Sequence, residues 1–371
     1  MLSTFSFPTT TLFGVGARLQ LRDLLARMGA KRPLVVTDSG LARTHAFALL
    51  TACLDGTHPA VFSNVRPNPL EEDVEGAFRA HRKNGCDAVV AFGGGSALDV
   101  GKAVRLRVKR PEQTLSQFDY DADWSGLVPL IAIPTTSGTG SEVGRSTVLI
   151  MGDRKRVIFH PSLLASLVIL DPEFTRELPP KLTAATGADA LTHCIESFTS
   201  PVFHPHCDGI ALEGIHLIGD ALIRAVKDGD DLHARGLMQI AAAMGGIAFQ
   251  KDLGATHSLA HPLSSLCGLH HGLANALCLP FVMDLNAEHK PGLYRRVGIA
   301  LGLSNPTDAA TIAAVRALLT EIGLTPGLRA HGVDESKIEA LTAQAFEDSC
   351  HATNPVPVTA NELRSLYLQA L

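Results

Sequence analysis

Four histidines crowd into the segment HSLAHPLSSLCGLHH at residues 257–271 of this 371-residue chain. His257 and His261 are four residues apart, so a helix would place both imidazoles on one face. His271 begins the next predicted helical segment, after a break at residues 267–270. Imidazoles gathered in this way can bind a metal, but a histidine-rich surface loop or core histidines with hydrogen-bonded rings would look similar. The spacing of this segment alone leaves all three interpretations open.

A second pair of candidate ligands lies about sixty residues before the histidine cluster. In GADALTHCIE, Asp189 and His193 are again four residues apart on a predicted helix. A carboxylate and an imidazole from one helix can meet imidazoles from another helix and enclose a divalent cation. A set of nitrogen and oxygen ligands suits Fe(II) or Zn(II). Two such pairs and a third histidine therefore predict a metal site in a helical domain.

Two polar glycine turns predict nucleotide binding. GGGS at residues 93–96 follows a predicted strand and precedes a predicted helix, where backbone amides and the helix N-terminus can bind a phosphate. A plain tight turn from strand to helix is the alternative. PTTSGTGSE at residues 134–142 supplies five hydroxyl groups after another predicted strand, the place where an α/β sheet binds nucleotides. Asp38 ends a third strand, where it would accept hydrogen bonds from ribose hydroxyls or, alternatively, form an Asx turn.

The elements that must position these residues divide the chain in two. Apolar runs at residues 32–40, 60–65, 86–96 and 127–142 alternate with amphipathic helical segments, which predicts right-handed βαβ units and a parallel sheet. From residue 181 onward we identify only long helical segments separated by Gly and Pro. We therefore predict an α/β dinucleotide-binding domain over residues 1–178 and an all-helical domain over residues 179–371.

Composition and charge favour a folded protein with small-molecule ligands. The chain is 46% hydrophobic and 19% charged, and its formal net charge of -5 argues against a nucleic-acid or anionic-membrane partner. No stretch reaches the roughly 18 apolar residues of a membrane span, and the N-terminal residues lack a signal-peptide pattern. The seven cysteines are scattered without a CxxC pair, so we expect reduced thiols in the core and a cytoplasmic location.

Taken together, the segments GGGSALDVGKA, PTTSGTGSEV, GADALTHCIE and HSLAHPLSSLCGLHHGLANALCLP resemble the iron-containing, or group III, alcohol dehydrogenases. The resemblance runs from about Pro33 through nearly the whole chain. It implies a dehydroquinate synthase-like architecture, with a cleft in which NAD(P)H from the α/β domain meets a carbonyl substrate beside a helical metal domain. It also implies hydride transfer between nicotinamide C4 and an alcohol or aldehyde carbon, and a homodimer or larger homo-oligomer.

The resemblance assigns roles to the histidine cluster. His261 matches the family histidine that lies near the nicotinamide and substrate without binding the metal, so it could relay a proton; a packing role is the alternative. His270 is ambiguous, and we assign the ligand to His271 because Gly272 follows it. The metal, Fe²⁺ or alternatively Zn²⁺ or another divalent cation, would be bound by Asp189, His193, His257 and His271.

The resemblance also assigns the cofactor contacts. Asp38 matches the acidic position associated with NAD over NADP. Arg156 stands where the family lysine is expected, with Lys155 beside it, so that contact is in doubt. The remaining contacts map to Gly94, Gly95, Ser96, Asp99, Thr135, Thr136, Thr139 and Ser141.

Within the family, the segments HPHCDGIALEGIHLI, GIAFQKDLGATHSLAHPL and GLHHG are most similar to 4-hydroxybutyrate dehydrogenases. A substrate carboxylate would need a cation, and Arg145, Arg156 and Lys251 are the candidates nearest in sequence. One alternative is a maleylacetate reductase-like enzyme, although such enzymes are expected to have lost metal ligands. Another is a dehydroquinate synthase-like lyase that uses NAD transiently, although it would need more Lys and Arg in the metal-domain motifs. A non-catalytic assembly module is the third.

Overall fold

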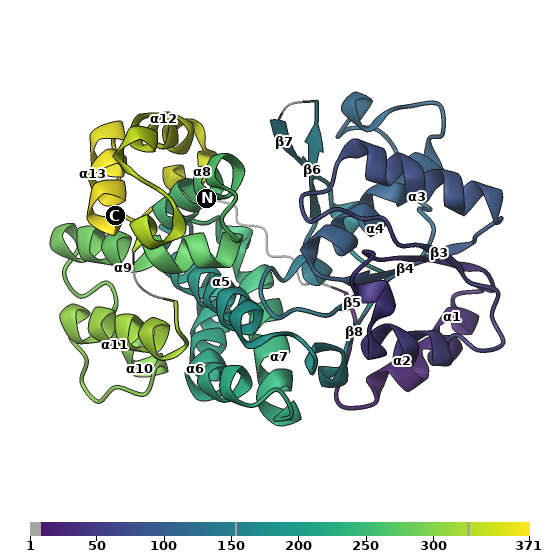
Figure 1. The fold of residues 1–371 in the computed structure, drawn as a ribbon, viewed down its shortest axis with the longest axis horizontal. Coiled ribbons are helices and arrows are strands. Elements are labelled where there is room, and N and C mark those ends of the chain that lie inside the picture. Colours follow the sequence, from purple (N-terminus) through teal and green to yellow (C-terminus); the bar gives the residue numbers. More distant parts are fainter. Residues whose placement is uncertain (1–8, 153, 325–326) are drawn as a thin grey trace. The chain divides into compact units, whose positions relative to one another are not determined.

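The computed structural model describes residues 9–152, 154–324 and 327–371. The chain forms two compact units (Figure 1). Among the described residues, the α/β unit contains residues 9–136 and Gly140–Glu177, and the helical unit contains Ser137–Thr139 and the residues from Leu178 onward. The short segment Ser137–Thr139, part of a predicted nucleotide-binding turn, therefore packs with the helical unit.

The α/β unit is built on a six-stranded parallel sheet in the order β1-β8-β5-β4-β2-β3. Its inner strands are short runs of Val, Ile, Leu and Ala that are buried on both faces, as expected when helices cover both sides of a parallel sheet. The predicted fold class is confirmed. The strands are β1 (Thr11–Phe13), β2 (Pro33–Val36), β3 (Ala60–Phe62), β4 (Ala88–Gly93), β5 (Leu130–Pro134) and β8 (Leu167–Leu170).

Four helices cover the two faces of this sheet (Figure 1). Helices α1 (Leu21–Arg27) and α2 (His45–Cys53) bury Leu25 and Leu50 in one hydrophobic core with Val90 and Ile131 of the sheet. On the other face lie α3 (Glu71–Lys83) and α4 (Gly95–Lys109). Gly101 lets α4 approach β4, because a Cβ at this position would lie 2.5 Å from Cβ of Ala91.

An antiparallel hairpin joins this unit and was not predicted from the sequence. Strands β6 (Ser146–Met151) and β7 (Arg154–Phe159) pair from Ser146 with Phe159 to Met151 with Arg154. Half-buried and buried residues alternate along β6, but its sequence, STVLIM, does not alternate between polar and apolar residues, so the pattern did not reveal the strand. Strand β1 was also missed, because three residues are too short to show a period.

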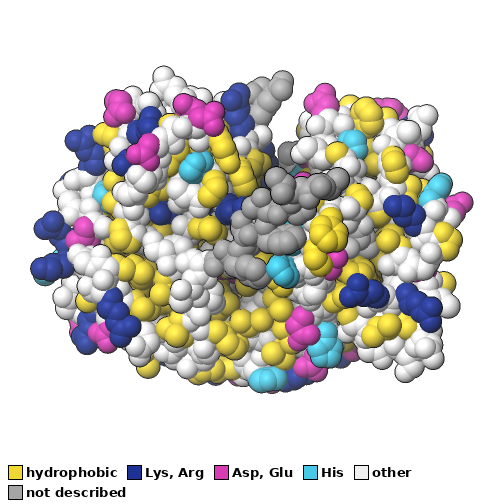
Figure 2. Space-filling view, turned by 180° about the vertical axis from the view of Figure 1, so that it is seen from behind, with side chains coloured by type: hydrophobic (Ala, Val, Ile, Leu, Met, Phe, Trp, Pro, Cys, Tyr) yellow, Lys and Arg dark blue, Asp and Glu magenta, His cyan; other side chains and the backbone are white. Residues whose placement is uncertain are grey.

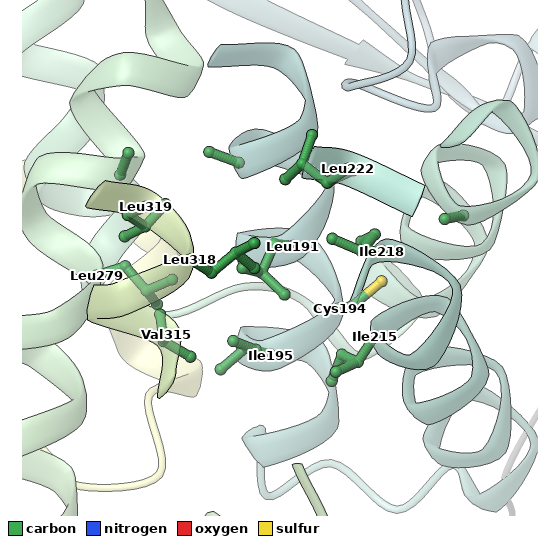
Figure 3. Close-up of a cluster of buried hydrophobic side chains, with 14 of the residues drawn as sticks. Leu191, Cys194, Ile195, Ile215, Ile218, Leu222, Leu279, Val315, Leu318 and Leu319 are labelled. Atoms are coloured by element: carbon green, nitrogen blue, oxygen red, sulfur yellow. The ribbon is translucent and has the colours of Figure 1, made fainter. Parts of the chain in front are cut away.

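The helical unit contains no strand among its described residues, as the sequence predicted. Helix α5 (Pro180–Thr199) is buried along nearly its whole length. Figure 3 shows Leu191 and Ile195 of α5 between apolar side chains of its neighbours, such as Leu279 and Ile218. The other helices are α6 (Pro205–Lys227), α7 (Leu232–Ala248), α8 (Ala255–Cys267), α9 (His271–His289), α10 (Arg295–Ala300), α11 (Asp308–Glu321), α12 (Ile338–Glu347) and α13 (Ala360–Ala370).

The surface and the cysteines agree with the composition. On the face drawn in Figure 2, Lys and Arg side chains are interspersed with Asp and Glu side chains. All seven cysteines are free thiols, and four of them are buried: Cys86, Cys194, Cys207 and Cys278. Within the described ranges, none of the helices combines the length and hydropathy required to cross a membrane.

Candidate functional site

Helix α5 presents a row of ionisable side chains along its buried length. Asp189 and His193 lie one turn apart, and Glu196 lies a further turn along; they are 2%, 5% and 4% exposed. Polar groups this deeply buried cost free energy unless they have partners. Their partners come mainly from α8 and α9, two helices that lie further along the sequence.

Helices α8 and α9 supply the histidine cluster, and a glycine turn separates them. His257 and His261 lie on α8, which ends at Gly268 in a left-handed conformation with φ of 70°. His271 is the first residue of α9. The next residue is Gly272, which lies directly against α5. A Cβ at this position would lie 1.9 Å from the carbonyl oxygen of Ala185, so only glycine fits. Any side chain at position 272 would therefore push His271 away from α5.

The predicted metal ligands converge on one carboxylate oxygen. Nε2 of His271, His193 and His257 lies 3.5, 3.8 and 4.0 Å from Oδ1 of Asp189. Neighbouring ligands of a tetrahedral site with bonds of 2.0–2.1 Å are about 3.4 Å apart. The tightest group contains Asp189, His257 and His271, whose ligand atoms all lie within 4.8 Å of one another. His193 lies at the edge of this group. Its ring is stacked on the ring of His257, with 4.9 Å between the ring centroids. These residues fit a divalent cation.

Asn275, one turn after His271, completes this cluster and was missed by the sequence analysis. Its Nδ2 lies 2.7 Å from Oδ1 of Asp189, 3.2 Å from Nε2 of His257 and 3.3 Å from Nε2 of His271. One amide donor group thus lies among three ligand atoms, which shows that these atoms face a common point. The spacing of four residues from His271 in HGLAN is the signal that could have identified it.

Burial and the neighbouring ionisable groups together set the protonation of the cluster. Desolvation lowers the pKa of His193 to about 4 and brings the pKa of His271 well below its usual value. Burial alone would raise the pKa of Asp189, but the neighbouring histidines outweigh it and hold this pKa at about 2. Near neutral pH the cluster therefore offers neutral imidazoles at these two positions and an ionised carboxylate, the forms that bind a cation.

His261 is bonded to a carboxylate that lies far away in the sequence. Its Nδ1 is 2.7 Å from Oδ2 of Asp348, whose Oδ1 accepts hydrogen bonds from the hydroxyl of Ser258 and the amide of Cys350. The His261 ring also stacks on that of His271, at 5.2 Å between centroids. Its side chain is 39% exposed, so the ring is oriented on one edge and accessible elsewhere. Asp348, which follows α12, was not predicted from the sequence.

The remaining charged candidates differ in their surroundings. His270 is exposed, whereas His271 beside it belongs to the cluster. Lys251, a candidate for binding a substrate carboxylate, is buried, and its ammonium group is bonded to Asp208 and to the carbonyl oxygen of Phe198. Its charge is therefore already compensated within the protein. Arg145 stacks over the ring of Phe159, and Arg156 is an exposed residue of strand β7.

The first glycine turn has the geometry of an anion site. Gly94 is the N-cap of α4, so Gly95 and Ser96 form its first turn, where backbone amides point out of the helix end. The hydroxyl of Ser96 donates to the carbonyl oxygen of Pro67. A Cβ at Gly94 would lie 3.5 Å from Thr136, which follows β5, so the ends of two neighbouring strands meet here.

Asp38, at the end of β2, forms the Asx turn that was weighed as its alternative role. Its Oδ1 accepts hydrogen bonds from the amides of Gly40 and Leu41 at 2.9 and 2.8 Å. Its Oδ2 lies near Gly93, since a Cβ on that glycine would be 4.0 Å away. The turn therefore fixes the Asp38 carboxylate beside the first glycine turn.

Asp99 and Ser141 hold the second glycine turn against α4. The hydroxyl of Ser141 donates to Oδ1 of Asp99 at 2.7 Å, and Oδ2 of Asp99 accepts from the amide of Val148 at 3.0 Å. The buried ammonium of Lys102 donates to the Ser141 hydroxyl at 2.7 Å and to the carbonyl oxygen of Ser146 at 2.6 Å. These groups join helix, turn and hairpin, which is a role that the sequence analysis did not give them.

Glu142 in this turn gives a testable pH dependence of stability. It is 3% exposed, and burial raises its pKa from 4.5 to about 7, although Lys102 opposes the shift. Because the folded-state pKa is the higher one, its contribution to stability is complete below about pH 4.5 and is lost as the pH rises through about 7. The loss is at most about 1.4 kcal/mol per pH unit. Gln at this position stays neutral and lacks this loss.

We therefore expect Glu142→Gln to gain stability relative to the unmodified chain as the pH rises from 5 to 8. The measurement is the free energy of unfolding in urea at several pH values in this range. Glu213→Gln, at an exposed position of α6, is the matched control and should show no such trend. Parallel pH profiles of the Glu142 variant and the unmodified chain would contradict the account of this residue.

Comparison with known proteins extends these observations. Residues 8–172 match the iron-containing alcohol dehydrogenases, and residues 183–371 match the C-terminal part of the Fe-containing alcohol dehydrogenase family. The chain is 39% identical over 370 residues to a 4-hydroxybutyrate dehydrogenase of Cupriavidus necator, with 96% of each chain covered. It is similar to the crystal structure of a 1,3-propanediol oxidoreductase, with a TM-score of 0.96, 32% identity and full coverage of both chains. It is also similar to a sulfoacetaldehyde reductase of Bifidobacterium kashiwanohense in complex with NAD⁺, with a TM-score of 0.92, 31% identity, and coverage of 100% and 99%.

Proposed function

This chain belongs to the iron-containing alcohol dehydrogenase family, and we propose that it is a metal-dependent, NAD-linked dehydrogenase that interconverts a primary alcohol and its aldehyde. The observation that carries the proposal is the set of three imidazole nitrogens within 4.0 Å of one Asp189 oxygen. The family name supports Fe²⁺ as the metal, and the ligand types equally accept Zn²⁺. The proposed ligands are Asp189, His193, His257 and His271.

The residues of the cluster have distinct tasks in this reaction. When bound, a divalent cation supplies a Lewis acid that polarises the oxygen of the alcohol or aldehyde. Asp189 and the three ligand histidines would hold the cation with side chains that lie on buried parts of helices or at a helix start. His261 is proposed to exchange a proton with the substrate oxygen, because it is accessible and is oriented by Asp348.

The α/β unit is proposed to bind NAD. The first turn of α4 would bind the pyrophosphate, and Asp38 would accept hydrogen bonds from the ribose and repel a 2′-phosphate. The solved relative in complex with NAD⁺ supports the choice of cofactor. The other predicted contacts with NAD stay predictions: Thr135, Thr136, Thr139, Asp99 and Ser141. Asp99 and Ser141 also have the structural role described above.

We propose 4-hydroxybutyrate and succinic semialdehyde as the substrate pair. The support is the identity of 39% with a 4-hydroxybutyrate dehydrogenase, together with the structural similarity to a reductase of another anionic aldehyde. The proposal requires a cation for the substrate carboxylate. Since Lys251 is bonded to Asp208, Arg145 and Arg156 are the candidates that remain. A homodimer and a cytoplasmic location also stay predictions.

The substrate proposal predicts a strong preference for the charged aldehyde. With Fe(II)-loaded protein under anaerobic conditions, kcat/KM for NADH oxidation should be at least about 10²-fold higher with succinic semialdehyde than with butanal, because butanal has no carboxylate to bind the cation that the proposal requires. Lactaldehyde serves as a second uncharged control. Equal turnover of the three aldehydes would contradict the proposed carboxylate-binding site but would still agree with an alcohol dehydrogenase. Lack of turnover with every aldehyde would favour the lyase alternative, for which consumption of NADH is not expected.

A further inference from the structure

Glu196 is the one buried carboxylate of α5 that the proposed reaction does not use. Its Oε2 lies 2.6 Å from Nδ1 of His257 and accepts the amide of Gly254 at 3.0 Å. Its Oε1 accepts the amide of Thr256 at 2.6 Å. The side chain is 4% exposed, so water does not replace these partners. One carboxylate thus serves three donors at the start of α8.

This arrangement determines which nitrogen of His257 carries hydrogen. An ionised carboxylate only accepts hydrogen bonds, so His257 must donate to Glu196 from Nδ1. In a neutral imidazole the other nitrogen then bears a lone pair. That nitrogen, Nε2, is the atom that lies 4.0 Å from Oδ1 of Asp189 and 3.2 Å from the amide nitrogen of Asn275. The lone pair therefore points into the proposed metal site.

The same carboxylate also fixes where α8 begins. Gly254 is the N-cap of this helix, and Thr256 is in its first turn, where amides have no partner inside the helix. A Cβ on Gly254 would lie 2.8 Å from Oε1 of Glu196, so the backbone passes directly against the carboxylate. Since Glu196 lies on the helix that carries Asp189 and His193, it joins the two ligand-bearing helices.

We infer that Glu196 is a positioning residue of the metal centre, which holds His257 in the tautomer with hydrogen on Nδ1 and sets the helix that carries it. The inference rests on the proposed function, because it assigns His257 to the metal. Carboxylate groups that orient a metal-bound histidine typically contribute 10–100-fold to metal affinity. The role is separable from catalysis, since it concerns binding of the metal itself.

The test uses metal affinity instead of activity. Glu196→Gln keeps the shape of the side chain but has one acceptor oxygen and one donor amide, so it cannot serve three donors. We expect its Kd for Co²⁺, measured anaerobically against a competing chelator, to rise about 10–100-fold, with a changed visible spectrum of the bound Co²⁺. Asn354→Ala is the matched control, because Asn354 accepts the Ala255 amide at the same helix start without contacting His257.

Three comparisons decide the inference. Glu196→Gln should weaken Co²⁺ binding much more than Asn354→Ala does, and equal losses in the two variants would reduce Glu196 to a helix cap. In a His257→Ala background, Glu196→Gln should cause little further loss, because its route to the metal is already removed. A full additional loss there would overturn the inference. If the unmodified chain binds no Co²⁺, the proposed function fails; if it binds and Glu196→Gln binds equally well, only this inference fails.

A measurement on the unmodified chain covers the case in which Glu196→Gln does not fold. In protein labelled with ¹⁵N-histidine and freed of metal, the imidazole shifts of His257 report which ring nitrogen is protonated. The shifts are read at a pH high enough for the His257 ring to be neutral, where the inference predicts hydrogen on Nδ1 and a bare Nε2. The signal is assigned by its disappearance in His257→Gln. Hydrogen on Nε2 of the neutral ring would overturn it.

Discussion

His271→Ala is expected to remove the bound metal and to lower kcat/KM for aldehyde reduction about 10³-fold or more. Stabilisation by a Lewis acid is worth several kcal/mol, and about 1.4 kcal/mol corresponds to each factor of ten. Nε2 of His271 is the imidazole nitrogen closest to Asp189, at 3.5 Å. The measurements are metal content by elemental analysis and steady-state oxidation of NADH at 340 nm.

His270→Ala is the control for this prediction. The two histidines are adjacent, yet His270 is exposed and His271 lies in the cluster, held against α5 by Gly272. We expect His270→Ala to keep both its metal and most of its activity. If the two variants exchanged roles, so that His270→Ala lost the metal, the assignment of the ligand would be wrong. Thermal unfolding of both variants without metal would show that neither effect comes from misfolding.

His261→Ala is expected to lower kcat by about 10²- to 10⁴-fold, the range typical of general acid–base catalysis, while the metal content stays unchanged. The physical reason is that His261 is accessible and oriented by Asp348, yet is not among the ligands that converge on Asp189. The measurement is kcat and KM for succinic semialdehyde together with metal analysis of the same sample.

Asp348→Asn tests how much the orientation of the His261 ring contributes to kcat, because this variant keeps His261 and changes only the group bonded to its Nδ1. An amide in place of the carboxylate keeps the volume but can turn a donor toward Nδ1, so we expect a smaller loss of kcat than in His261→Ala and an intact metal content.

Unchanged kcat in His261→Ala would identify this histidine as a packing residue beside His271. Loss of metal in that variant would show instead that it supports the ligands.

The spacing of residues along the sequence predicted those features of the protein that lie within a single helix or strand. The alternation of apolar runs and helical segments predicted the parallel sheet and the helical region from residue 181 onward. The intervals of four residues placed Asp189 with His193 and His257 with His261 on single helices, and the break at residues 267–270 separated α8 from α9. Each of these follows from a helical or strand period, which is a property of neighbouring residues.

The partners of the site could not be predicted in this way, because they join distant parts of the chain. Glu196 lies 61 residues from His257, and Asp348 lies 87 residues from His261. No periodicity connects such pairs, and only the packing of α5, α8 and the segment after α12 brings them together. Lys251 illustrates the reverse case, since its place beside the cluster in sequence predicted a substrate contact, whereas folding buries its charge against Asp208.

The central claim is that one metal ion at the Asp189 cluster is required for hydride exchange with NAD. It is tested most directly by removing metal with a chelator and following NADH oxidation as Fe(II) is returned anaerobically in fractions of one equivalent per chain. The account predicts that the metal-free protein is inactive, and that activity rises in proportion to added Fe(II) and stops rising at one equivalent. Full activity in the metal-free protein would contradict it.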